Sequence, residues 1–201
     1  MVLEKPQIAR TAFQRLYDMV ASYGFKEYSE YKKTIKHYNF FDDPIDHGKD
    51  AVFGLDVHIM KMVNFFKAAA HRNGPEKRVI LLHGPVGSAK STITRLLKKG
   101  IENYSKTPEG ALYSYTWKNL NDILKMEDSM ACPINEEPLR LIPKHMHHEI
   151  LKHINNGKNR EEAVHIEGDL CPPCRYIYQH LLKHYKGDWE QVMEKHIECR
   201  R

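Results

Sequence analysis

Residues 84–91 of this chain have the residue types and spacing of a loop that binds phosphate groups. Their sequence, GPVGSAKS, follows the pattern GxxxxGK[ST] at every fixed position but one. Gly84 and Gly87 let the backbone bend so that successive N–H groups point at phosphate oxygens. Lys90 supplies a full positive charge, and the hydroxyl of Ser91 is a ligand for Mg²⁺. The segment therefore predicts binding of ATP or GTP with Mg²⁺.

The one departure from the pattern is Ala89, which takes the place of the last glycine. Alanine suits the start of a helix where φ is negative, although its methyl group can crowd a phosphate. The alternative interpretation is a glycine-rich turn with a chance lysine. We expect the nucleotide to contact Gly84, Pro85, Val86, Gly87, Ser88, Ala89, Lys90, Ser91 and Thr92.

The elements around this loop favour a strand before it and a helix after it. Residues 78–83 contain a continuous apolar run, which is typical of a buried strand. Apolar residues at helical spacing predict a helix over residues 90–99 that stops at Gly100. Residues 111–117 and 163–166 are the other candidate strands. This order predicts an α/β fold with a parallel P-loop sheet that is short of strands.

Helical patterns occupy much of the remaining chain. They cover residues 8–23, the segment after Gly54, the segment after Pro143, and a tail from Pro173 that breaks at residues 186–188. Residues 25–50 are polar and aromatic with turn signals, and we expect them to lead into the core without forming part of it. Helical segments therefore flank the expected sheet at both ends of the chain.

The bulk composition favours a cytoplasmic protein without membrane segments. The sequence has no apolar signal-peptide core at its start and no apolar run long enough to cross a bilayer. The formal net charge is +5, but the basic residues are dispersed in pairs and do not indicate a nucleic-acid-binding surface.

Cys171 and Cys174 form a Cys-x₂-Cys pair that precedes His180 and His184. Such a set can bind zinc, although five residues between the pairs is a short gap for a zinc finger. The sequence around the pair lacks the βαβ pattern of a thioredoxin-like redox site. We favour two small buried thiols at the start of a helix and leave zinc open.

Two further groups have a chemical and a structural interpretation. Glu136 and Glu137 could serve general acid–base chemistry, but adjacent residues usually point apart, and we favour a solvated turn. Tyr113, Tyr115 and Trp117 alternate as on one face of a strand, where aromatic side chains are more often part of a core than a base-stacking surface.

Several longer blocks resemble the bacterial PrkA family, whose members are described as AAA+ serine protein kinases. They are residues 52–56 (VFGLD), 83–91 (HGPVGSAKS), 132–139 (CPINEEPL) and 168–175 (GDLCPPCR). The resemblance extends from about residue 10 to residue 198. It implies that ATP is the nucleotide and that Phe53 and Gly54 border the adenine.

The resemblance also implies a domain organisation. Residues 1–50 would be an N-terminal helical extension, and residues 51–201 the N-terminal part of an AAA+ domain. The Walker B strand, the sensors and the arginine finger would follow residue 201, so the chain would bind ATP but hydrolyse it poorly. The sequence itself shows no kinase catalytic loop.

Three functions are therefore open. The first is an ATP-binding segment of a serine protein kinase that acts on a protein substrate. The second is an AAA+ ATPase that remodels proteins without phosphorylating them. Either would be compatible with a homo-oligomer formed through the AAA+ core. The third, suggested by the basic charge, is a P-loop module that binds nucleic acid.

Overall fold

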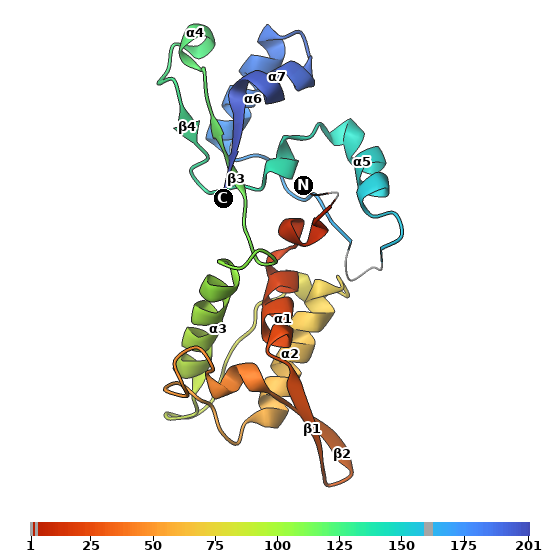
Figure 1. Cartoon of the computed structure of the whole chain (residues 1–201), viewed down its shortest axis with the longest axis vertical. Helices are drawn as coiled ribbons and strands as arrows, with labels where there is room; N and C mark the ends of the chain where they lie inside the picture. Colours follow the sequence, from red (N-terminus) through yellow and green to blue (C-terminus); the bar gives the residue numbers. More distant parts are fainter. Residues whose placement is uncertain (1, 3, 159–162) are drawn as a thin grey trace. The chain divides into compact units, whose positions relative to one another are not determined.

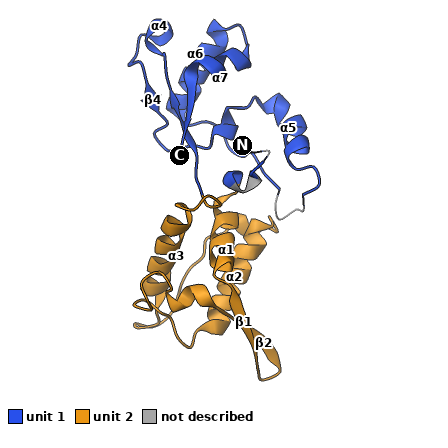
Figure 2. Cartoon of the chain, in the orientation of Figure 1, with its two compact units in different colours: residues 1–9, 111–158, 162–201 blue, residues 10–110, 159–161 orange. Residues whose placement is uncertain are grey.

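The computed structural model describes residue 2, residues 4–158 and residues 163–201. The chain divides into two compact units, each of which is considered by itself (Figure 2). Unit 2 consists of residues 10–110 with 159–161, and unit 1 of residues 1–9, 111–158 and 162–201. The bounds of these units differ from those of the two domains expected from the sequence, which were residues 1–50 and 51–201.

Within its described residues, unit 2 consists of helices and one β-hairpin (Figure 1). The hairpin pairs its strands in antiparallel register, with Phe25 opposite Tyr38. The elements in chain order are α1 (Ala12–Ser22), β1 (Phe25–Glu30), β2 (Lys33–Tyr38), η2 (Asn39–Asp42), α2 (Asp56–Ala70), η3 (Pro75–Lys77) and α3 (Lys90–Tyr104).

Unit 1 combines short helices with a three-stranded antiparallel sheet of order β4-β3-β5. In this sheet, Trp117 pairs with Met130 on one side and with Ile197 on the other. The elements are η1 (Pro6–Ala9), β3 (Ser114–Trp117), α4 (Asn121–Leu124), β4 (Met130–Ala131), η4 (Pro138–Leu141), η5 (Lys144–Met146), α5 (His147–Ile154), α6 (Pro172–His184), α7 (Trp189–His196) and β5 (Ile197–Arg200).

The helices were largely predictable because their signals are local. α1 begins at a capping box in which Thr11 and Gln14 satisfy each other's backbone N–H groups. α2, α5, α6 and α7 lie where apolar spacing and turn residues predict them, and the tail breaks at Lys186–Asp188 as expected. None of the described helices is long and apolar enough to span a membrane.

The parallel sheet is not formed, and this prediction was wrong. Residues 78–83 are not a strand, and residues 163–166 are not one either. Val79 and Leu81 are 94% and 83% exposed, although their run reads as a buried strand. Every strand pair in the described residues is antiparallel. An apolar run becomes a strand only when partner strands satisfy its peptide groups, and pairing of that kind is not encoded within the run.

Residues 25–50 are part of the core of unit 2, contrary to our expectation. Phe40 and Phe41 are 0% and 1% exposed and contact each other edge to face. They pack in one cluster with Met19 of α1, Val63 of α2 and Leu96 of α3. The segment before α2 therefore helps to fix the position of the helix that follows the phosphate loop.

Gly100 lies inside α3 and does not end it, so the predicted stop was wrong. A methyl group at this position would lie 2.6 Å from ring atoms of Phe40 and 2.7 Å from the sulfur of Met19. Glycine is needed here because α3 approaches α1 and η2 too closely for a side chain. The helix consequently runs on to Tyr104.

We predict that Gly100→Ala destabilises the chain. Overpacking against the buried Phe40 ring costs about 1–3 kcal/mol, more than the roughly 1 kcal/mol that alanine contributes in a helix. Urea unfolding followed by circular dichroism measures the change. The matched control is Lys98→Ala on the exposed side of α3, which should stay within about 0.5 kcal/mol of the parent. A Gly100→Ala variant as stable as the parent would contradict this close packing.

Candidate functional site

The phosphate-loop sequence forms a tight turn that leads directly into α3. Gly87 has φ of 82°, and Ala89, the N-cap of α3, has φ of 54° and ψ of 13°. The condition under which alanine would suit this position, a negative φ, is therefore not met. The left-handed conformation costs a non-glycine residue about 1–2 kcal/mol. Ala89 thus carries backbone strain at the mouth of the loop.

The side chain of Lys90 turns back into the curve of the loop. Its ammonium donates hydrogen bonds to the carbonyl oxygens of Gly84 at 2.8 Å and Pro85 at 2.5 Å, and to Ser88 Oγ at 2.8 Å. Ser88 Oγ in turn donates to the Pro85 carbonyl at 2.8 Å. The loop carbonyls thus hold a positive charge on its concave side.

The N-terminus of α3 has no side-chain cap, because Ala89 has no polar atom to offer. The first N–H groups of a helix lack intrahelical partners and carry a partial positive charge. The first hydrogen bond of the helix runs from Ile93 N to the Ala89 carbonyl at 2.8 Å. The N–H groups of Lys90, Ser91 and Thr92 precede that bond, and an anion can accept from such groups.

A cavity of about 400 Å³ lies beside the loop within unit 2. Gly84, Pro85, Ser88 and Lys90 line it on one side, together with the neighbouring Leu81–His83 and Ile93. On the other side it is lined by α2 and its N-cap, through Leu55, His58 and Lys61. The volume is in the range of small-molecule sites.

The structure gathers only part of the predicted set around this cavity. Val86 is fully exposed, and Ser91 and Thr92 lie in the first turn of α3. Phe53 is 80% exposed, and neither Phe53 nor Gly54 lines the cavity. The residue that follows them, Leu55, does line it. Sequence reasoning missed His58 and Lys61, although their spacing of three residues in an expected helix places them on one face.

These residues fit a Mg²⁺-bound nucleoside triphosphate. The uncapped end of α3 and the Lys90 ammonium are both positive, and they converge on the loop that borders the cavity. The Ser91 hydroxyl, exposed in the first helical turn, is of the chemical type that binds Mg²⁺.

The predicted solvated turn at Glu136 and Glu137 was wrong. The Glu136 side chain is 1% exposed and accepts hydrogen bonds from Arg140, Tyr115 and the backbone N–H of Cys171. Burial raises the pKa of Glu137 to about 7. Local sequence does not reveal this burial, because two of the three partners, Tyr115 and Cys171, are 21 and 35 residues away from Glu136.

The cysteine pair is buried, as expected, but His180 and His184 do not join it. Both histidines are exposed, and His180 Nδ1 lies 2.9 Å from the Tyr176 carbonyl within the same helix. Burial raises the pKa of the Cys171 thiol to about 12, which opposes the reactive thiolate of a redox site. The expected core role is confirmed for Tyr115 and Trp117, which are both 0% exposed, whereas Tyr113 lies before β3 and is only half-buried.

The match to a family model and the mixed helical and β architecture identify an AAA-type domain of the α/β class. The sequence model of the PrkA AAA domain matches residues 1–200, so the match includes the segment expected to be an extension. The chain belongs to the PrkA family.

A curated relative from Bacillus subtilis (strain 168), named ATP-dependent protease PrkA, is 34% identical over 198 residues. The alignment covers 98% of this chain and 26% of the relative, so the chain spans about a quarter of that protein's length. No solved structure matches the chain.

We predict that Ala89→Gly stabilises the chain. Glycine relieves the left-handed strain at φ of 54°, for a net gain of up to about 1 kcal/mol in the free energy of unfolding. Urea unfolding tests this expectation. The matched control is Ala68→Gly inside α2, where the same substitution should cost about 1 kcal/mol. A loss of stability in both variants would show that Ala89 does not adopt the left-handed conformation.

Proposed function

We propose that this domain binds ATP with Mg²⁺ through the Gly84–Ser91 loop. The observation that carries the proposal is the position of the Lys90 ammonium, held by three loop acceptors beside the uncapped N-terminus of α3. A cation at the positive end of a helix is unfavourable by itself. A bound phosphate group neutralises the lysine charge and the charge of the helix end together. The arrangement is therefore favourable when a phosphate is bound.

The remaining roles follow from the lining of the loop and cavity. Backbone N–H groups and Lys90 bind the phosphates, and Ser91 contributes a hydroxyl ligand to Mg²⁺. The apolar side chains of Leu55, Leu81 and Leu82 offer a surface for the base. ATP is preferred over GTP on the basis of family membership.

We further propose that this chain turns ATP over slowly. Hydrolysis needs a group that orients water and commonly an arginine that stabilises charge on the γ-phosphate. Among the described residues, those that line the cavity contain no carboxylate and no arginine. We therefore expect the domain to bind the nucleotide and to contribute little to its hydrolysis.

The protein in which this domain acts would use ATP on a protein substrate. Kinase activity was implied by resemblance, whereas the Bacillus subtilis relative is named an ATP-dependent protease. That name favours the second hypothesis, an ATPase that remodels proteins, over phosphorylation. Assembly into a homo-oligomer through the AAA-type core is part of the same proposal.

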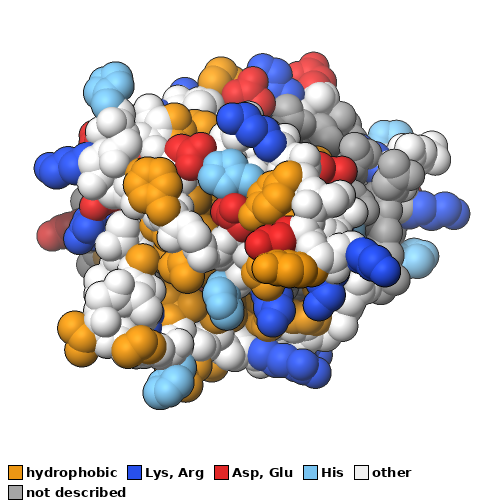
Figure 3. All heavy atoms as spheres, turned by 90° about the horizontal axis from the view of Figure 1, so that it is seen from below, with side chains coloured by type: hydrophobic (Ala, Val, Ile, Leu, Met, Phe, Trp, Pro, Cys, Tyr) orange, Lys and Arg blue, Asp and Glu red, His pale blue; other side chains and the backbone are white. Residues whose placement is uncertain are grey.

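Nucleic-acid binding has the least support of the three hypotheses. On the face drawn in Figure 3, acidic and basic side chains of the described residues are interspersed with apolar ones. Binding to a phosphate backbone relies on an extended surface of positive charge.

Lys90→Ala should reduce the affinity for Mg·ATP by at least about tenfold, since a charged hydrogen-bond partner of the phosphates is worth about 1.5–3 kcal/mol. Calorimetric titration measures the dissociation constant. Lys98→Ala, eight residues along the same helix and exposed, keeps the net charge change the same and should bind as the parent does. Equal affinity in parent and Lys90→Ala would remove the proposal.

The fate of ATP separates the two enzyme classes. We expect the chain, incubated with γ-labelled Mg·ATP and casein, to release phosphate at close to the background rate and to leave casein unlabelled, because the described residues that line its cavity include no carboxylate and no arginine. Scintillation counting of free phosphate and of precipitated protein gives both values. Labelled casein, absent with Lys90→Ala, would restore the kinase hypothesis. Rapid phosphate release would contradict slow turnover.

A further inference from the structure

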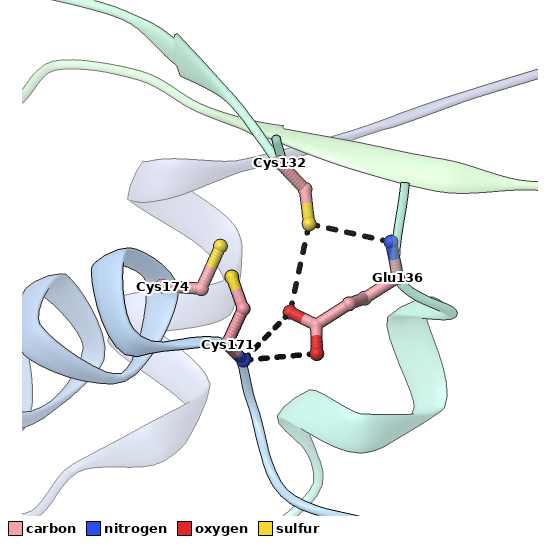
Figure 4. A group of neighbouring side chains, drawn as sticks. All are labelled: Cys132, Glu136, Cys171 and Cys174. Atoms are coloured by element: carbon pink, nitrogen blue, oxygen red, sulfur yellow. Dashed lines mark hydrogen bonds between the residues drawn. The ribbon is translucent and has the colours of Figure 1, made fainter. Parts of the chain in front are cut away.

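Four side chains with metal-binding groups meet inside unit 1, whereas the phosphate loop belongs to unit 2. They are Cys132, which follows β4, Glu136 in the next turn, and Cys171 and Cys174 at the start of α6. All four residues are buried. Figure 4 shows the three sulfur atoms and the carboxylate facing a common space. One ligand atom from each residue lies within 4.8 Å of all the others.

The separations are close to those around a tetrahedral metal ion. Zinc with bonds of about 2.0–2.3 Å holds its ligand atoms roughly 3.5–3.8 Å apart. Cys132 Sγ already lies 3.5 Å from Glu136 Oε2. Side-chain shifts of about 1 Å would bring the wider pairs to the same spacing. The backbone therefore places all four groups in range of one ion.

N–H groups also point at two of the sulfur atoms, and Cys171 is the N-cap of α6. The indole N–H of Trp117 donates to Cys174 Sγ at 3.3 Å, and the backbone N–H of Glu136 donates to Cys132 Sγ at 3.3 Å. Such N–H groups aimed at sulfur orient the ligands of metal sites from outside the coordination sphere.

We propose that Cys132, Cys171, Cys174 and Glu136 bind a structural zinc ion. Three sulfur ligands select zinc over Mg²⁺ and Ca²⁺, which prefer oxygen. Four protein ligands in a buried position leave no open site for water, so the ion stabilises the fold and does no catalysis. Binding releases the three thiol protons to solvent, and Arg140 at 3.1 Å from Glu136 Oε1 offsets part of the ligand charge.

The consequence for unit 1 is a link between segments that are far apart in sequence. The ion would join the end of β4 and its following turn to α6, inside the core that contains Trp117 and Leu181. The rival account is an apolar cluster of free thiols, with Glu136 held by Arg140, Tyr115 and Cys171 alone. Metal content distinguishes the two accounts.

The test is the zinc content of the purified, untagged chain from zinc-supplemented medium, measured by mass spectrometry of the metal. We expect about one zinc ion per chain. Cys132→Ser, Cys171→Ser and Cys174→Ser should each lose nearly all of it. Cys199→Ser, at an exposed cysteine outside the cluster, should retain it. The double variant His180→Ala/His184→Ala should also retain it, which separates this site from the set expected from the sequence.

A second measurement covers variants that fail to fold. Cobalt added to the parent chain after zinc removal should give the absorption bands of a tetrahedral ion with thiolate ligands. Glu136→Gln, which keeps the three sulfurs, should weaken zinc binding at least about tenfold; unchanged affinity would remove Glu136 from the ligand set. A folded parent chain with neither zinc nor a cobalt–thiolate spectrum would overturn the proposal.

Discussion

The central constraint in this domain is a positive charge held at the positive end of a helix. Lys90 heads α3, and its ammonium is retained by carbonyl groups of the loop that precedes the helix. α3 cannot shift away from the loop, because Gly100 packs it against Phe40 and Met19 in the core of unit 2. Strain at Ala89 adds to the cost of the same turn. The charge of Lys90 and the strain at Ala89 thus occur in one loop, which a rigid core holds in place. Such unfavourable features are typical of a binding site, where the ligand offsets them.

The features that the sequence predicted well are those encoded by neighbouring residues. The capping box at Thr11, the apolar spacing of α2 and the phosphate-loop pattern each lie within about twenty residues and needed no knowledge of distant contacts. The role of Gly100 was misread, because a glycine that stops a helix and one that permits close packing look identical until the partner, sixty residues away, is known. The aromatic residues at 40 and 41 were misread for the same reason.

Pairing between distant segments accounts for the other errors. The run at 79–82 has the composition of a buried strand, but a sheet also requires partner strands, which a run of four residues cannot specify. Cys171 and Cys174 could be paired with the nearby histidines only by spacing, whereas Glu136, 35 residues away from Cys171, bonds to its backbone N–H. The burial of Cys174, Ile177 and Leu181 defines the inner face of α6, and this apolar stripe was the available sign that His180 and His184 face outward.

The exposure of residues 79–82 affects how the chain behaves in solution. Val79, Ile80, Leu81 and Leu82 are 94%, 37%, 83% and 36% exposed, and no strand pairs with them among the described residues. An unpaired, β-prone apolar segment is a template for strand addition between molecules, and extended segments are also the form that many peptide-binding clefts accept. Apolar residues without a strand partner among the described residues therefore lie directly before the phosphate loop, in a form that an added strand or a peptide-binding cleft could cover.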